Sequence, residues 1–201
     1  RIESRGLGDV YKRQIFNAPP ETQEQTLLKL DYSINDSHRV EYIYQETQDV
    51  NIREYDFPQF NYVFSSHYYV YPIDREKNTF AYIGDISDDL SVEVKYTDIV
   101  YKNDQDSLGG ENFGHHRITL SSGERAFPTS EQYRSANETN IDEEILSLKA
   151  TLLRGNHTIS MGYDMHEKFV SNLFIAFENG RFYLNSVDDF VIGNLTYLLF
   201  I

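Results

Sequence analysis

Strict alternation of apolar and polar residues is the feature of this sequence that most restricts its fold. In residues 26–34 (TLLKLDYSI) every second residue from Leu28 to Ile34 is apolar, and Lys, Asp and Ser stand between them. After the polar segment 35–37 the alternation resumes in residues 38–45. Side chains two apart lie on the same face of a strand, so this pattern predicts two strands joined by a short turn.

The same unit appears twice more in the chain. Residues 79–101 alternate on both sides of Ser87-Asp88-Asp89, and residues 144–164 alternate on both sides of Arg154-Gly155-Asn156. The sequence therefore predicts three hairpins with six strands.

The connections between the hairpins differ from the turns within them. Residues 49–77 and 103–140 are long, polar and rich in Tyr, Asn, Asp and Gly. Structureless connections beyond about 12–15 residues are uncommon in soluble domains, whereas short turns alternating with long loops are typical of transmembrane β-barrels. We expect an all-β fold: an antiparallel up-and-down meander of about six to eight strands, forming an open part of a transmembrane β-barrel with short turns at one end and long loops at the other.

Composition narrows the classes of function. The 201 residues are 40% hydrophobic and 25% charged, which is typical of a folded chain, and 16 Tyr and 13 Phe favour strands. No segment approaches the roughly 18 apolar residues of a membrane-spanning helix. A net charge of −14 argues against nucleic acid as a partner, and the absence of cysteine excludes disulfides and thiolate sites.

Five tyrosines lie near predicted strand ends. Amphipathic rings in this position anchor strands at a membrane interface, although tyrosine is also an ordinary strand-forming residue. These residues are Tyr42, Tyr44, Tyr96, Tyr101 and Tyr163.

The first 14 residues, RIESRGLGDVYKRQ, differ from the rest because four basic and two acidic residues give them a charge of +2. The string GLGDVYKRQ resembles sequencing-adapter read-through, so residues 1–14 are expected to be an artefact. The alternative is a disordered basic tail. Residues 15–201 are taken as the folded part.

Four segments resemble one family, the TonB-dependent receptors, specifically the Oar-like type with a carboxypeptidase-regulatory-like N-terminal domain. They occur in the family's order. They are LLKLDYSINDSHRVEYIYQ (27–45), DISDDLSVEVKYTDIVYKNDQDSLGG (85–110), EQYRSANETNIDEEILSLKATLLRGNHTISMGYDMHEKFVSNLFI (131–175) and GRFYLNSVDDFVIGN (180–194).

The resemblance implies a parent protein with a plug domain inside a barrel of about 22 strands in the outer membrane. It implies uptake of a large nutrient or metal chelate, driven by the inner-membrane TonB complex through the plug. No plug or TonB box is visible, and the sequence stops inside a new apolar run, 195–201. Residues 15–201 are therefore expected to be a partial barrel domain in contact with outer-membrane lipid. The alternative function is a secreted or surface β-sandwich that binds carbohydrate.

Motifs of catalysis and of cofactor binding are not found. The sequence has no GxGxxG, P-loop, HExxH or GxSxG motif, so we expect no enzyme activity, no catalytic residues and no cofactor. The acidic pairs Glu143-Glu144 and Asp188-Asp189 are expected to reflect the acidic composition rather than catalysis.

Two segments contain residue types that bind metal ions. Residues 103–110 resemble the start of a calcium loop, but Leu108 stands where an oxygen ligand is needed, and a solvated loop is expected instead. Neighbouring residues on a strand point in opposite directions, so His115 and His116 are expected to be a surface pair rather than metal ligands.

Aromatic residues are concentrated between positions 55 and 71 (YDFPQFNYVFSSHYYVY). In a loop, these rings could contact substrate or lipopolysaccharide, or they could pack the loop on the barrel rim. The predicted contact residues are Tyr62, Phe64, Tyr68, Tyr69 and Tyr71.

Overall fold

A computed structural model describes residues 20–53, 61–110, 114–134, 136–195 and 197–199. Residues 1–14, the expected artefact or tail, lie outside these ranges, as does the start of the aromatic segment.

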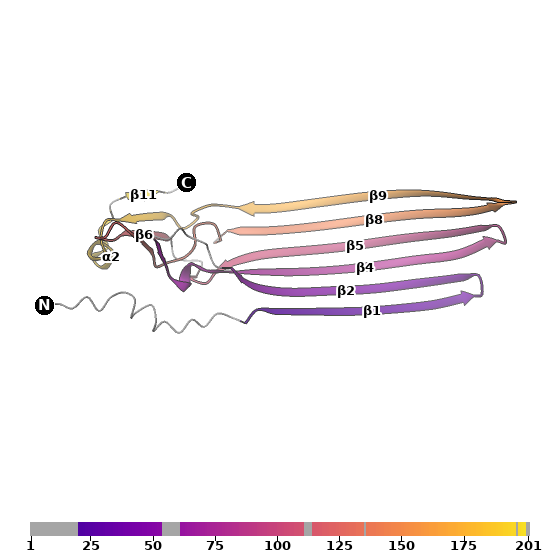
Figure 1. Cartoon of the computed structure of the whole chain (residues 1–201), viewed down its shortest axis with the longest axis horizontal. Helices are drawn as coiled ribbons and strands as arrows, with labels where there is room; N and C mark the ends of the chain where they lie inside the picture. Colours follow the sequence, from indigo (N-terminus) through magenta and orange to yellow (C-terminus); the bar gives the residue numbers. More distant parts are fainter. Residues whose placement is uncertain (1–19, 54–60, 111–113, 135, 196, 200–201) are drawn as a thin grey trace.

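The chain is dominated by one long antiparallel sheet of six strands (Figure 1). The strands follow one another in the order β1-β2-β4-β5-β8-β9, and every neighbouring pair is antiparallel. The two outermost strands are not paired with each other, so the sheet is open. This confirms the predicted all-β meander. Its strands are β1 (Thr22–Asn35), β2 (His38–Arg53), β4 (Tyr69–Ser87), β5 (Leu90–Ser107), β8 (Asn137–Arg154) and β9 (His157–Phe174).

Two-residue turns close all three hairpins at the same end of the sheet (Figure 1). Asp36 and Ser37 connect the first two strands, where the Ser37 amide donates a 2.9 Å hydrogen bond to Asn35 Oδ1. In the third turn, Gly155 has a φ of +58°, a left-handed conformation that glycine adopts without steric cost. The turn residues that the sequence indicated are therefore the residues at which the chain reverses.

Successive hairpins are staggered along the strand direction. The first hairpin ends its pairing at His38, which is level with Val92, and the second continues two residues further to Leu90. Leu90 is level with Leu152, and the third hairpin again continues two residues, to Arg154. An advance of about 6.6 Å for every two strand spacings of about 9.6 Å inclines the line of turns by about 35°. Strands tilt by this amount where a sheet curves into a barrel.

The strands are longer than the alternation predicted. The expected loops 49–77 and 103–140 begin and end inside strands, and the true connections are 54–68 and 108–136. Alternation fades in the outer halves of the strands because polar residues occupy both faces there, while the backbone ladder continues. The predicted solvated loop at 103–110 is thus wrong for residues 103–107, which belong to β5.

The long connections are not structureless, because together with the segment after β9 they build a second sheet beyond the ends of the long strands (Figure 1). Its order is β11-β10-β6-β7-β3, with β10 parallel to β6 and β3 parallel to β7. A short 3-10 helix, η1 (Ser65–His67), and a helix, α2 (Val187–Ile192), accompany it. The strands are β3 (Asn61–Val63), β6 (His115–Thr119), β7 (Arg125–Phe127), β10 (Arg181–Leu184) and β11 (Tyr197–Leu199).

A small apolar core holds the second sheet together. Ile118, Ala126 and Leu184 are buried, and Phe64 and Phe182 are among the rings packed against them. The long sheet has no comparable core, since most of its large apolar side chains are exposed. The stability of the long sheet therefore depends on backbone pairing between its strands and on an environment that covers its apolar face.

Candidate functional site

An apolar band crosses one face of the long sheet, on the side of the short turns. Strand pairing places its residues side by side on all six strands. Most of them are exposed; Tyr32 retains 68% and Met161 66% of its accessible surface. The band consists of Leu28, Leu30, Tyr32 and Ile34 on β1; Val40, Tyr42 and Tyr44 on β2; Phe80, Tyr82 and Ile86 on β4; Leu90, Val92, Val94 and Tyr96 on β5; Leu146, Leu148, Ala150 and Leu152 on β8; and Ile159, Met161, Tyr163 and Met165 on β9.

The band shifts toward the turns between the first hairpin and the second. On β1 and β2 it begins at the level of Leu28 and Tyr44, and on the later strands it begins one row closer to the turns, at the level of Phe80. It covers about 20 Å along a strand and about 24 Å across six strands. The band is thus continuous across the sheet.

Aromatic side chains border the band on the side away from the turns. Tyr42 lies opposite Phe80, with ring centroids 4.7 Å apart, and Phe80 lies opposite Tyr96. The phenol of Tyr42 donates a 2.7 Å hydrogen bond to Asn78 Oδ1, and that of Tyr96 hydrogen-bonds to Glu144. Both phenols therefore point out of the band toward polar residues, while their rings stay within it.

Beyond the aromatic border, the same face becomes acidic. Eleven carboxylates and one ammonium group, that of Lys102, project from it between the border and the outer strand ends. The first carboxylate stands two residues beyond the band on β5, β8 and β9, and four residues beyond it on β4. The carboxylates belong to Glu24, Glu46, Asp74, Glu76, Asp98, Asp104, Asp106, Glu138, Asp142, Glu144 and Glu167.

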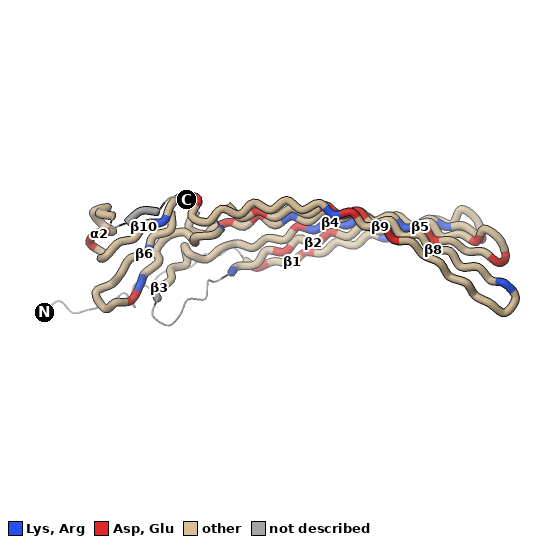
Figure 2. Tube along the Cα trace, turned by 90° about the horizontal axis from the view of Figure 1, so that it is seen from above, with Lys and Arg blue, Asp and Glu red and all other residues tan. Residues whose placement is uncertain are grey.

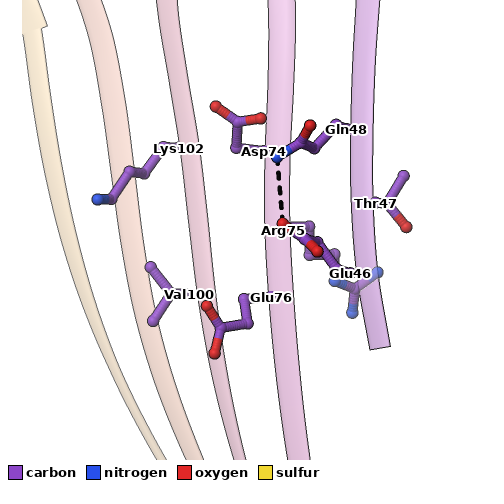
Figure 3. A pocket seen from close by; sticks show the side chains of 8 residues that line it. All are labelled: Glu46, Thr47, Gln48, Asp74, Arg75, Glu76, Val100 and Lys102. Carbon is purple, nitrogen blue, oxygen red and sulfur yellow. Dashed lines mark hydrogen bonds between the residues drawn. The ribbon is translucent and has the colours of Figure 1, made fainter. Parts of the chain in front are cut away.

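A shallow pocket lies in this acidic region, across β2, β4 and β5 (Figure 3). Glu46, Asp74 and Glu76 line it together with Gln48 and Lys102. Within the ranges that the structure describes, no ion pair joins these carboxylates to Lys102. The pocket is a strongly polar surface immediately outside the apolar band.

The opposite face of the long sheet carries charged residues of both signs, among isolated apolar residues such as Ile43, Ile99 and Ile145. Figure 2 shows acidic and basic residues along the long strands. The Lys29 ammonium lies 3.3 Å from Asp31 and 3.4 Å from Glu41, and Lys95 pairs with Glu93 at 2.9 Å. All ion pairs found between described residues of this sheet are on this face. It is suited to contact with water.

Predicted contact residues lie in two places rather than on one surface. Tyr69 and Tyr71 are on β4 and project from the polar face of the long sheet. Tyr62 is on β3, Phe64 packs on the core of the second sheet, and Tyr68 follows η1. Contact between these rings and substrate or lipopolysaccharide stays a prediction.

Arginines cover two of these tyrosines. The guanidinium carbon of Arg134 lies 4.5 Å from the ring centre of Tyr69, and that of Arg53 lies 5.6 Å from that of Tyr71. These cation–π contacts hold both rings against the sheet. They give the two tyrosines a packing role at the outer end of the polar face.

The histidine pair of β6 is not a surface pair, contrary to the sequence-based expectation. His115 is 3% exposed, with its ring centre 5.3 Å from that of His67 and 5.5 Å from that of Phe127. His116 points to the other side, as predicted, and stacks on Phe182. The pair is enclosed because β6 is an inner strand of the second sheet.

Burial shifts the titration of this cluster. It lowers the pKa of His115 to about 3, with further contributions from the charges of His67 and Arg181, and it also lowers the pKa of His67. Both rings are therefore neutral at pH 7. In the part of the chain that the structure describes, no three metal-binding side chains come together.

The two acidic pairs do not converge on a common centre. Adjacent on β8, Glu143 and Glu144 point to opposite faces, and Lys168 lies 3.3 Å from Glu143. Asp189 is at the start of α2, where its amide donates a 3.0 Å hydrogen bond to the capping Ser186 hydroxyl. This hydrogen bond caps the exposed helix end and is structural. The Ser186 hydroxyl also helps to hold the pKa of Asp189 below its usual range.

Comparisons with protein-family models, curated proteins and solved structures gave no match. None of the described helices is both long and apolar enough to cross a bilayer.

Two functional features were missed at the level of sequence. The acidic region escaped notice because its carboxylates alternate with residues that are also polar, although Glu138, Asp142 and Glu144, which share one strand face, were a usable signal. A group of arginines on the second sheet had no signal at all, since it depends on pairing between β6 and β10, which are far apart in the chain.

Proposed function

We propose that this chain forms part of the wall of an outer-membrane β-barrel, in a receptor of the TonB-dependent type that imports a large nutrient or metal chelate. The observation that carries the proposal is the exposed apolar band, which is continuous across six paired strands and is bounded by aromatic rings on β2, β4 and β5 and then by carboxylates. Transmembrane barrels present such a band to lipid between aromatic girdles.

The energetics of the band favour lipid over water as its environment. Apolar surface transferred from water gains roughly 25 cal/mol per Å², so a face of about 20 by 24 Å is costly to leave hydrated. Soluble monomers rarely expose apolar patches beyond a few hundred Å². The band is somewhat shorter than the roughly 25 Å of a typical barrel, and the interfacial phenols extend it at the outer edge.

The polar face supports the same proposal, because it would line a water-filled lumen. Its side chains alternate with the apolar ones, and its balanced charges form ion pairs, as at Lys29 and Lys95. The stagger of about 35° matches the tilt of membrane-spanning strands. In the complete wall, β1 and β9 would pair with further strands, which removes their exposed edges.

The alternative, a β-sandwich that binds carbohydrate, requires two sheets packed face to face with their apolar sides inward. Figure 1 shows the second sheet beyond the end of the long one. The apolar side chains of the long sheet remain exposed instead of facing a partner sheet. A barrel wall therefore accounts for more of the structure than a sandwich does.

The receptor type rests on the four segments that resemble Oar-like proteins. The second sheet lies at the strand ends opposite the short turns (Figure 1), which agrees with it. Short turns of such barrels face the periplasm, and long connections face the outside. The second sheet would then stand at the external mouth. The TonB complex would act on a plug supplied by the parent protein.

Cysteine labelling of the full chain in phospholipid vesicles tests the proposal, and the chain offers a background without cysteine. An environment-sensitive fluorophore on Leu148→Cys should report lipid and be quenched by a lipid-soluble quencher. On the neighbouring Ser147→Cys, which faces the other side, it should be quenched only from water. Water exposure at both positions would contradict a lipid-facing band.

The acidic region provides a matched depth control. Glu144→Cys lies on the same face as Leu148→Cys, four residues further from the turns. Its fluorophore should respond to the aqueous quencher. A second test is the surrounding gene: an open reading frame that is complete within residues 15–201 would contradict a barrel wall that needs further strands.

A further inference from the structure

Three arginines form a diagonal line across the second sheet, on the face opposite its apolar core. Arg181 on β10, Arg117 on β6 and Arg125 on β7 are on neighbouring strands. Arg181 is level with His115, and Arg125 is level with Thr119, so each step to the next strand also advances two residues. Because alternation puts all three on one face, their guanidinium groups point to the same side.

The ring of Tyr183 lies between two of these arginines. The guanidinium carbon of Arg117 is 3.9 Å from the ring centre of Tyr183, and that of Arg181 is 4.8 Å away. Cation–π contact holds both guanidinium planes in place. Less rotational freedom is then lost when these groups bind a ligand.

The charge of the three arginines is not balanced within the described residues. No carboxylate of the described chain lies within 4 Å of any of them, although the protein carries a net charge of −14. The nearest acidic neighbour in sequence, Glu124, instead accepts a 2.9 Å hydrogen bond from Ser122.

The local environment of Arg117 reflects this imbalance. Burial lowers the pKa of its guanidinium, and the charges of Arg125 and Arg181 lower it further. The Nε atoms of Arg117 and Arg181 are buried without a hydrogen-bond partner among the described residues. An anion placed here would supply both the missing charge and the missing acceptors.

We propose that Arg117, Arg125 and Arg181 form a binding site for a soluble ligand that carries a multivalent oxyanion, a phosphate or polycarboxylate group. Guanidinium groups bind carboxylate and phosphate oxygens in pairs, which a compact ammonium group does not.

In the receptor proposed above, the second sheet stands at the external mouth, so this anion would belong to the imported cargo. That assignment to cargo rests on the proposed function, whereas the anion site does not. Anion binding at the three arginines can be measured whether or not the apolar band faces lipid. Failure of the cysteine labelling and failure of the titration would therefore be separate results.

Calorimetric titration of the full chain in zwitterionic detergent micelles tests the site, with pyrophosphate and citrate as probes. Binding of at least one probe should be saturable and should weaken as salt is added, because the contact is between charges. Arg117→Gln and, at the exposed end of the line, Arg125→Gln should each weaken it by about tenfold. The second variant keeps the test valid if the half-buried Arg117 is needed for folding.

Arg154→Gln, in the turn between β8 and β9, is the matched control and should bind as the unaltered chain does. Absence of saturable heat with both probes would overturn the proposal, as would equal weakening in the control. Vesicles with and without anionic lipid separate the two sources of phosphate. Binding to anionic vesicles alone, with neither soluble probe bound, would assign the arginines to lipid headgroups and overturn the soluble ligand.

Discussion

The phenol oxygen of Tyr82 lies 2.8 Å from Nδ1 of His38, and the two rings stack with centroids 5.9 Å apart. The two side chains meet over the backbone of Gly84, which pairs with His38 on the neighbouring strand. A glycine in a strand lets an aromatic ring fold over its backbone. The pair ends the apolar band beside the turn between β1 and β2, whereas on β4 and β5 the band continues to Ile86 and Leu90.

Substitution of Gly84 should therefore be destabilising. A Cβ at this position would overlap the Tyr82 phenol and the His38 ring, so Gly84→Ala should cost about 1–3 kcal/mol of unfolding free energy. Gly162 on β9 is the control, because the nearest atom to its added Cβ, the Leu148 carbonyl oxygen, is at an ordinary 3.5 Å. Urea unfolding of the vesicle-bound chain would show the difference, and equal midpoints for both variants would refute this role of Gly84.

Removal of an interfacial hydroxyl should weaken the outer border of the band. Tyr42→Phe deletes the hydrogen bond to Asn78 and leaves that side-chain oxygen without its donor, so a loss of about 1 kcal/mol is expected. Tyr32→Phe removes a phenol inside the band and should change the unfolding midpoint less. If the Tyr32 variant proved the more harmful of the two, the border would not be where the structure places it.

A charge on the apolar band should be far more costly than one on the polar face. Leu148→Arg should destabilise the inserted chain by about 2–4 kcal/mol, the cost of an arginine facing the centre of a bilayer. Ser147→Arg, one residue away on the polar face, should cost less than about 1 kcal/mol. Comparison of unfolding free energies in vesicles decides the matter, and similar costs at both sites would argue for water on both faces.

Lowering the pH should destabilise the second sheet, because its buried histidines bind protons more readily when the chain is unfolded. The pKa of His115 falls from about 6.5 in the unfolded chain to about 3 in the folded one, so the unfolded chain binds a proton first. Its contribution to stability is therefore complete above pH 6.5 and is lost as the pH falls from there toward 3. The protection factors of the amides of residues 115–119, which correct for the slower intrinsic exchange in acid, should fall between pH 7 and pH 4.5.

A variant isolates the histidine contribution from other titrations. Burial raises the pKa of Glu131, so its protonation acts in the opposite direction as the pH falls. His115→Gln should remove much of the acid sensitivity, whereas His157→Gln, at an exposed turn, should leave it unchanged. An unaltered pH profile in the first variant would exclude His115 as the source.

The three hairpins could be predicted because their signals are local. Alternation from Leu28 to Ile34 reports which side chains share a face, and the Asp36-Ser37 and Gly155-Asn156 pairs mark where the chain reverses. The apolar band follows directly from these segments. Its continuity across six strands does not, since that depends on the register between hairpins.

The outer halves of the strands could not be predicted from alternation. Asn103 and Asp104 are both polar, yet Asn103 is 2% exposed on the polar face and Asp104 projects from the acidic one. Their strand conformation comes from pairing with β8, not from a difference in hydropathy. Similarly, His115 was placed on the surface because nothing local indicates that β6 has a neighbour on each side.

By itself, the sequence determined the β class, the positions of the short turns and the apolar or polar character of each strand face, because these depend on residues within a few positions of one another. Only the tertiary structure decided the stagger of the hairpins, the level of the acidic region and the second sheet. In that sheet, Arg117 meets Tyr183 across 65 intervening residues. Contacts between segments so distant in the chain leave no periodic trace, since hydrogen bonding between backbones is open to almost any residue.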